Sequence, residues 1–133
     1  MNRWRLAALA TLLLAVVGIG GCFLFPNHAP VASFTVTRGV DLDDPDSQLV
    51  VMLDASGSTD SDGDEIVNYM WVFDEENVTV IAPLASSKTV TYPVLTVKYQ
   101  VQVDSSTVEL VVVDSRGGTS IPVSMTIMVP VPE

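Results

Sequence analysis

The chain has 133 residues, a length that predicts one domain, and its formal net charge is -10. A surface this acidic repels phosphate, so the composition excludes nucleic acid as a partner. Hydrophobic residues make up 48% of the chain, but part of that share belongs to the N-terminal segment and not to a core.

Residues 1–21 have the pattern of a signal peptide that is cleaved from the mature chain. Two arginines are followed by an apolar stretch over residues 6–19 and then by two glycines, the small residues that a signal peptidase accepts. The order Ile19-Gly20-Gly21-Cys22 resembles the bacterial lipobox, in which the cysteine becomes the lipid-modified first residue. Cleavage there leaves four basic residues against 16 acidic ones, a formal charge of about -12.

Two other interpretations of this segment stay open: an ordinary signal peptide in which Cys22 has no role, and a retained membrane anchor. The apolar stretch is short for a membrane span, which needs about 20 residues. Cys22 is the only cysteine, so the chain cannot form an internal disulfide, and lipidation gives that residue a function. We therefore expect residues 22–30 to be a lipidated tether at the cell envelope. Phe23 after the cysteine favours the outer membrane or the cell surface.

Seven segments after the tether have the alternating or continuous apolar pattern of strands, with turn-forming residues between them. They are residues 31–36, 49–53, 66–73, 78–82, 89–103, 107–113 and 119–129. Pro93 breaks the fifth segment into one or two strands, and Pro122 indicates an edge strand or a bulge in the last. No helical period with caps follows residue 22. The pattern predicts an all-β, immunoglobulin-like β-sandwich over residues 31–129, with residues 130–133 as a tail.

Three motifs occur in a fixed order along this region. They are NHAPVASF at residues 27–34, DASGSTDSDGDEIVNYMWVF at residues 54–73, and VVVDSRGG at residues 111–118. Together they resemble the PKD domain, the immunoglobulin-like sandwich named after polycystic kidney disease. The similarity covers residues 27–129, and the middle motif is the long and specific one. The resemblance implies a non-catalytic module that acts as a spacer or in adhesion or protein interaction on extracellular proteins.

One departure from the family pattern follows the third strand. The family usually continues with Gly-Asp-Gly, whereas this chain has Asp74-Glu75-Glu76. Without glycine a tight turn cannot take its usual positive-φ form. We therefore expect a longer, reshaped loop there.

The resemblance also implies calcium, because related modules of bacterial collagenases bind it through the loop that matches residues 58–63. In a sandwich of this kind one pole holds the start of the first strand together with two loops. These are the loop between the second and third strands and the loop between the sixth and seventh strands. The candidate ligands of this hypothetical metal site are Asn27, Asp60, Asp62 and Asp114. The alternative stays open that these aspartates accept hydrogen bonds from backbone amides in their own loops.

The opposite pole is expected to collect a second acidic group. Its members are Asp41, Asp43, Asp44, Asp46, Asp74, Glu75, Glu76 and Asp104. These carboxylates either bind a basic partner or cations, or form a solvated end that keeps the protein soluble.

Tyr69, Trp71 and Phe73 recur at period 2 and therefore face one side of their strand, which predicts a role in the core. The alternative is an exposed platform that stacks on sugars.

His28, the only histidine, lies in the tether and is interpreted as a solvated linker residue. With no G-x-S-x-G motif and no Cys–His pair, no catalytic residue is assigned and the protein is not expected to be an enzyme.

These observations predict a membrane-anchored cell-envelope lipoprotein whose PKD-like module acts in protein–protein interaction or adhesion. The alternatives are a polysaccharide- or peptidoglycan-binding module and a structural spacer of an envelope assembly. The expected partners are the membrane, through lipid on Cys22, and an envelope or extracellular protein. Calcium is the one candidate cofactor.

Overall fold

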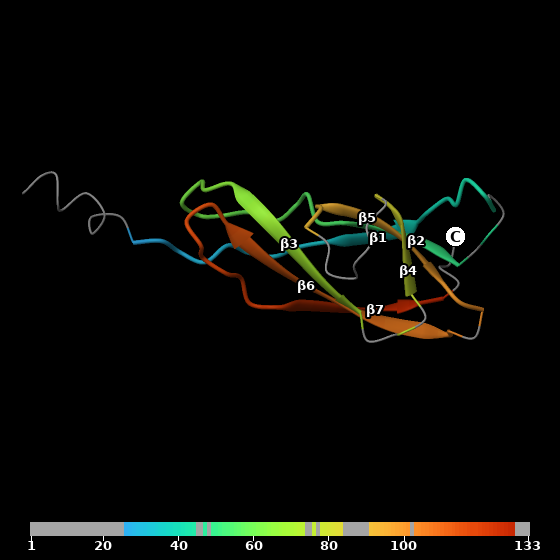
Figure 1. The fold of residues 1–133 in the computed structure, drawn as a ribbon. Coiled ribbons are helices and arrows are strands. Elements are labelled where there is room, and N and C mark those ends of the chain that lie inside the picture. Colours follow the sequence, from blue (N-terminus) through green and yellow to red (C-terminus); the bar gives the residue numbers. More distant parts are fainter. Residues whose placement is uncertain are drawn as a thin grey trace, which may run out of the picture.

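The structure, a computed structural model, describes residues 26–44, 47, 49–73, 76, 78–83, 91–101 and 103–129. The strands are β1 (Thr35–Arg38), β2 (Val50–Asp54), β3 (Ile66–Phe73), β4 (Val78–Ala82), β5 (Val94–Tyr99), β6 (Ser105–Asp114) and β7 (Val123–Met128). They form two antiparallel sheets, ordered β1-β2-β5-β4 and β3-β6-β7 (Figure 1). This is the strand arrangement of an immunoglobulin-like sandwich, and it confirms the predicted fold class. Within the described residues, no helix is long and apolar enough to cross a membrane.

The continuous apolar run of β2 places it in the interior of the four-stranded sheet. Val51 and Leu53 face the core, and Val50 on the opposite face is also fully buried. Gly39 explains this second burial, because the chain after β1 turns across the outer face of the sheet and a Cβ on Gly39 would lie 2.8 Å from Val50. A strand that is covered on both faces has apolar residues at consecutive positions.

Trp71 on β3 fills the space between the two sheets. Its side chain is 2% exposed, its ring meets the ring of Phe34 edge to face at 5.3 Å, and its indole Nε1 donates a hydrogen bond to the Tyr92 carbonyl at 2.9 Å. Tyr69 and Phe73 are half-buried and pack against the same core. The alternating pattern of β3 therefore directs its three large rings inward.

The first and last predicted strands begin later than their sequence patterns indicate. Val31 forms an isolated pair with Thr59, and the continuous strand starts only at Thr35. The segment predicted at 119–129 becomes a strand at Val123, directly after Pro122, which has no amide hydrogen to donate to a ladder. β7 is an edge strand, as that proline indicates.

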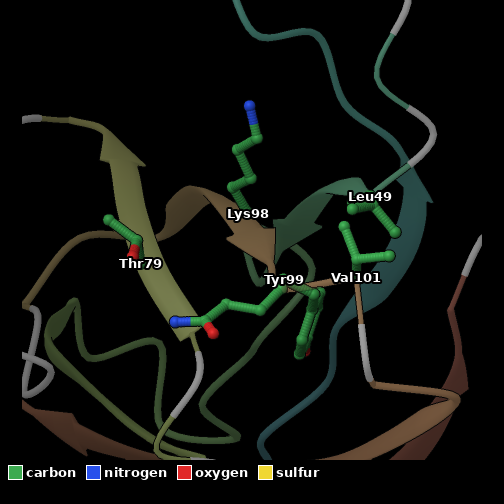
Figure 2. Close-up of a pocket in the computed structure, with 6 residues that line it drawn as sticks. Leu49, Thr79, Lys98, Tyr99 and Val101 are labelled. Atoms are coloured by element: carbon green, nitrogen blue, oxygen red, sulfur yellow. The ribbon is translucent and has the colours of Figure 1, made fainter.

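The sandwich has two poles that carry different loops. The tether pole consists of the N-terminal residues 26–31, the β2–β3 loop and the β6–β7 loop, which lie together at one end in Figure 1. The distal pole carries the β1–β2 and β5–β6 loops, with Leu49 and Val101 side by side there (Figure 2).

Several predictions fall on residues outside the described part of the chain. They concern the signal peptide at residues 1–21, Cys22, the acidic residues Asp46, Asp74 and Glu75, and the tail at residues 130–133.

Candidate functional site

Two loops at the tether pole share the sequence pattern Asp-Ser-x-Gly and the same arrangement of hydrogen bonds. Asp60-Ser61-Asp62-Gly63 follows β2, and Asp114-Ser115-Arg116-Gly117 ends β6. In each loop the first aspartate accepts through Oδ1 the amide of the residue two positions on, at 2.7 Å and 2.8 Å. The amide four positions on is also bonded to Oδ1, at 3.4 Å in the first loop and 2.8 Å in the second. Both aspartates therefore hold the backbone of their own turn, as aspartate does in Asx-turns.

Glycine is required at three positions of these loops. Gly63 and Gly117 have φ values of +79° and +87°, a left-handed conformation that glycine adopts at little cost. Gly118 is needed for space, since a Cβ there would overlap the Asp114 carboxylate and lie 2.6 Å from the Asn27 amide nitrogen. The absence of a side chain lets Asn27 and Asp114 meet.

The N-terminal segment is bonded to both loops. Asn27 Nδ2 donates to Asp114 Oδ2 at 3.0 Å. The backbone amide of His28 donates to Asp62 Oδ2 at 2.7 Å, and its ring Nδ1 lies 2.7 Å from Asp62 Oδ1. Val31 and Thr59 exchange two backbone hydrogen bonds of 2.7 Å and 3.1 Å. Residues 27–31 are thus fastened to the sandwich before β1 begins.

The two loops also bond to each other. The Ser115 amide donates to the Glu65 carbonyl at 2.8 Å, and Arg116 Nη1 lies 3.4 Å from Asp64 Oδ2. The N-terminal segment therefore binds a preformed surface made of two connected turns.

These contacts stabilise the ionised form of two carboxyl groups. The backbone amide of His28, followed by its ring, lowers the pKa of Asp62. Burial alone would raise the pKa of Asp114, which is 1% exposed, but the Gly118 amide, the Asn27 side chain and the Arg116 amide together lower it. Both groups are therefore charged at neutral pH.

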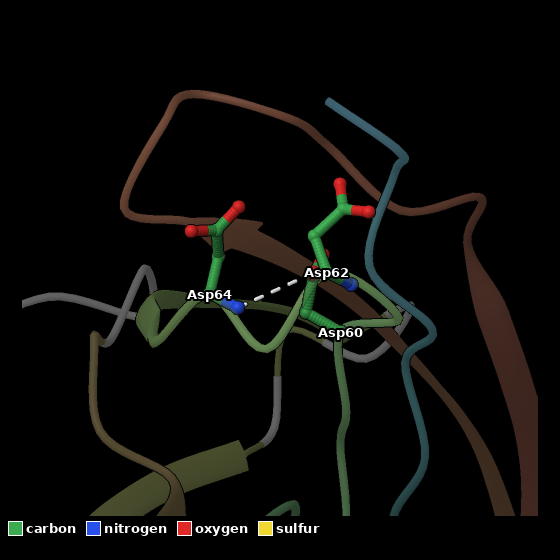
Figure 3. Close-up of side chains that lie close together, drawn as sticks. All are labelled: Asp60, Asp62 and Asp64. Atoms are coloured by element: carbon green, nitrogen blue, oxygen red, sulfur yellow. Dashed lines mark hydrogen bonds between the residues drawn. The ribbon is translucent and has the colours of Figure 1, made fainter. Parts of the chain in front are cut away.

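The structure brings Asp60, Asp62 and Asp64 together (Figure 3). One carboxylate oxygen from each lies within 4.8 Å of the others. Asp60 Oδ2 is buried and has no hydrogen-bond partner among the described residues, so this oxygen is available to a cation. Asp62 accepts the backbone amide of His28 and lies 2.7 Å from the His28 ring Nδ1.

Of the four predicted ligands, Asp60 and Asp62 lie in this cluster. Asn27 and Asp114 are bonded to each other, and the remaining Asp114 oxygen is taken by backbone amides. Asp64, which the prediction left out of the ligand set, occupies the third place. The donor set is hard and oxygen-rich, the kind that calcium prefers.

At the distal pole, Lys98 of β5 holds the β1–β2 loop. Its Nζ lies 2.7 Å from Asp41 Oδ2 and 3.4 Å from Asp44 Oδ2. The hydrogen bond from Lys98 lowers the pKa of Asp41, and the bond to Asp41 raises the pKa of Lys98. Part of the acidity expected at this end is thus neutralised within the domain.

The exposure of the aromatic rings tests whether β3 carries a platform that stacks on sugars. Trp71 is buried, Tyr69 and Phe73 are half-buried, and Tyr92 at 47% exposed is the one exposed Tyr, Trp or Phe ring among the described residues. A row of exposed rings, which a stacking platform requires, is therefore not formed on β3.

No protein-family model matches the chain, and no curated protein matches it. Among solved structures, the PKD1 domain of the metalloprotease PrtV from Vibrio cholerae is 29% identical with a TM-score of 0.53, covering 77% of this chain and 98% of that one. The PKD1 domain of Epp from Vibrio anguillarum is 26% identical with a TM-score of 0.54, covering 80% and 100%. The protein carries a PKD-like domain. The fold is also similar to part of a nucleoside hydrolase-related hypothetical protein from Saccharophagus degradans. That match covers 77% of this chain and 26% of the other chain, with 22% identity and a TM-score of 0.51.

Sequence reasoning missed four residues that build the site of the PKD-like domain. His28 was interpreted as a solvated linker residue, and Asp64, Arg116 and Gly118 received no role. The signal that was available is the repeated Asp-Ser-x-Gly sequence, which places equivalent turns in two loops. No sequence signal links His28 to Asp62, 34 residues away.

Proposed function

We propose that the protein is a lipid-anchored cell-envelope protein whose PKD-like domain is a non-catalytic module for protein interaction or adhesion. The observation that carries this proposal is the attachment of residues 27–31 to the tether pole. Only a few residues separate Asn27 from Cys22, the lipidation site in the proposal. A domain fastened this close to its anchor presents its distal pole away from the membrane.

The environment of the polar groups supports a non-catalytic role. The single histidine, His28, is engaged by Asp62, and Asp60 and Asp114 stabilise turns. General acid–base catalysis needs groups poised in a cleft toward a substrate. The two Vibrio structures to which the chain is similar are PKD domains, and this similarity supports the proposed non-catalytic module.

Replacement of Cys22 tests the anchor. The wild-type protein should incorporate an alkyne-labelled fatty acid and fractionate with membranes, and Cys22→Ser should lose both properties. Retention of label and membrane association in Cys22→Ser would reject lipidation at this residue.

Photo-crosslinking in intact cells tests the interaction role. A photoreactive amino acid at Asp104 on the distal pole should capture an envelope or extracellular protein, whereas one at Ser61 on the tether pole should capture lipid or membrane components. Capture of polysaccharide alone at Asp104 would favour the carbohydrate-binding alternative.

Calcium at Asp60, Asp62 and Asp64 is a further part of the proposal. The buried, unbonded Asp60 Oδ2 supports it. Bound calcium would supply charge compensation for three close carboxylates and would stiffen the tether pole. Millimolar calcium should raise the melting temperature relative to chelator, and Asp64→Asn should remove the difference while Asp104→Asn keeps it. An equal melting temperature with calcium and with chelator rejects the site.

A further inference from the structure

A groove at the distal pole runs between the β1–β2 loop and β4. Its volume is about 450 Å³, and it is lined by Val40, Asp41, Leu42, Asp43, Thr79, Val80, Ile81 and Ala82. A second hollow of about 370 Å³ shares Thr79 with it and is lined further by Leu49, Lys98, Tyr99, Gln100 and Val101. In Figure 2, Thr79 lies at one side of this hollow and Leu49 with Val101 at the other. The two hollows share Thr79 as a lining residue and together are called the distal groove below.

The loop wall of the distal groove is fixed in place by the domain itself. Gly39 packs against Val50, and its amide donates to the Val50 carbonyl at 2.9 Å. Lys98 then holds Asp41 at 2.7 Å. A ligand would therefore bind to a wall that is already ordered, which reduces the entropic cost of association.

The opposite wall is the backbone of an edge strand. Four consecutive residues of β4, Thr79 to Ala82, line the groove, although alternate side chains of a strand point to opposite faces. The lining therefore follows the strand edge and not one face. Among the described strands β4 pairs with β5 alone, and the register shifts between Val80 and Ala82. The unpaired edge of β4 on the N-terminal side of this shift accepts an extended peptide as an added strand, whereas the shift itself disfavours pairing beyond it.

The exposed side chains of the groove define the chemistry of its ligand. Leu42 is 91% exposed, Val40 is 62% exposed and Val101 is 84% exposed, so they offer apolar contact area. Asp43 is exposed on the rim and forms no ion pair with a described residue. Lys98 pairs with Asp41 and, at a longer distance, with Asp44, so its single positive charge offsets only part of their charge. Asp43 adds an exposed carboxylate on the rim, and the groove therefore presents negative charge to a ligand. Apolar and cationic groups on one ligand would complement this surface.

We propose that the distal groove binds an extended segment of a partner protein in which apolar and basic residues alternate. The inference rests on the proposed interaction function and gives it a surface and a partner class. A second copy of this chain does not fit as the occupant, because its four basic residues after Cys22 are isolated in the sequence. They are Arg38, Lys88, Lys98 and Arg116.

Peptide binding to the full-length protein in a non-ionic detergent tests the inference. The probe is a short fluorescent peptide in which valine alternates with lysine, and the reference peptide has serine in place of valine and the same charge. Fluorescence anisotropy should show binding of the valine peptide that is roughly tenfold tighter than binding of the serine peptide. Equal binding of both peptides would overturn the proposal, because it would mean general attraction to an acidic protein.

Matched variants locate the binding. Leu42→Ser and Asp43→Asn should each weaken binding of the valine peptide about fivefold. The controls make the same chemical changes elsewhere: Val72→Ser alters an exposed residue of the other sheet, and Glu65→Gln removes one charge at the tether pole. These controls should bind like the wild type. An equal loss in the controls would overturn the assignment to the groove.

Charge reversal at Asp43 predicts a gain of binding, which an unfolded variant would not show. Asp43→Lys should lose the lysine-containing peptide and bind a peptide in which valine alternates with glutamate. No gain of the glutamate peptide would contradict the role of Asp43.

The groove and the anchor can fail separately. If Cys22→Ser leaves the membrane and a crosslinker at Asp104 captures a protein, but the valine peptide does not bind, the groove assignment is wrong and the proposed function stands. If the peptide binds and Cys22→Ser stays on the membrane, the anchor is wrong and the groove stands.

Discussion

Aspartates in the loops and at strand ends mainly accept hydrogen bonds from backbone amides in this protein. Asp41, Asp54, Asp60 and Asp114 each accept the amide of the residue two positions on, at 2.7–3.0 Å. The side-chain carboxylate satisfies amides that a strand leaves unpaired where it ends. An acidic composition is therefore partly a consequence of how the turns of the sandwich are closed. The sequence left the turn role and a metal site open as alternatives, and the contacts assign the turn role to Asp60 and Asp114.

Gly118→Ala should disrupt the Asn27–Asp114 contact, because the added Cβ overlaps the Asp114 carboxylate. The expected loss is about 1–3 kcal/mol in the free energy of unfolding, measured by urea denaturation. Gly57→Ala is the control, since the nearest atom to its Cβ is 4.0 Å away, and it should unfold like the wild type. Equal stability of both variants would mean that the Asn27–Asp114 contact does not stabilise the fold.

Acid should destabilise the fold through the carboxyl groups of lowered pKa. In Asp41, Asp54, Asp62 and Asp114 the folded pKa lies below the ordinary value of 3.8, so these groups stabilise the fold when pH exceeds that value. The contribution is lost as pH falls through the lower folded pKa. Urea midpoints should therefore be nearly constant from neutral pH to about pH 5 and should decrease below about pH 4.

Asp114→Asn is the matching variant, because it removes one of the four carboxyl groups whose pKa is lowered. Its urea midpoint should be lower than that of the wild type at neutral pH and should change less below about pH 4. An acid-dependent decrease of the same size in this variant would exclude Asp114 as a source.

At the scale of elements, strand interiors were predictable and strand ends were less so. The ranges 66–73 and 78–82 match β3 and β4 residue for residue. Their apolar and β-branched residues are bounded by polar turns, so the local sequence pattern is sufficient to predict where each of these strands begins and ends. β1 and β7 begin later than predicted, because Val31 and Thr119 each form a single bridge, to Thr59 in a loop and to Val113 of β6, instead of a continuous ladder. Such pairing depends on tertiary contacts that no local pattern contains.

Neighbouring residues of β3 provide a test of its orientation. Trp71→Ala should cost about 3–5 kcal/mol in unfolding free energy, because it leaves a cavity between the sheets. Val72→Ala should change stability by less than about 0.5 kcal/mol, since Val72 is 54% exposed on the outer face. Similar losses in chemical denaturation would mean that β3 does not alternate between core and solvent.

At the scale of the whole molecule, the sandwich topology predicted which loops meet but not which atoms do. The expected pole of the first strand, the β2–β3 loop and the β6–β7 loop is present. The partners of His28 and Lys98 are more than 30 residues away, at 34 and 57 positions, and depend on the register of both sheets. The distal groove depends on Gly39, whose close approach to Val50 has no sequence signature.

The central claim is that residues 27–31 belong to the rigid domain, so that the proposed lipid anchor would lie at the tether pole and the distal pole would face away from it. Nitrogen-15 relaxation of the full-length protein measures this directly. The amides of His28 and Val31 should have order parameters of about 0.85, like those of β2 and β6, and Gly118→Ala should lower the value at His28. Order parameters below about 0.6 at both residues in the wild type would contradict the claim and describe a domain on a flexible tether.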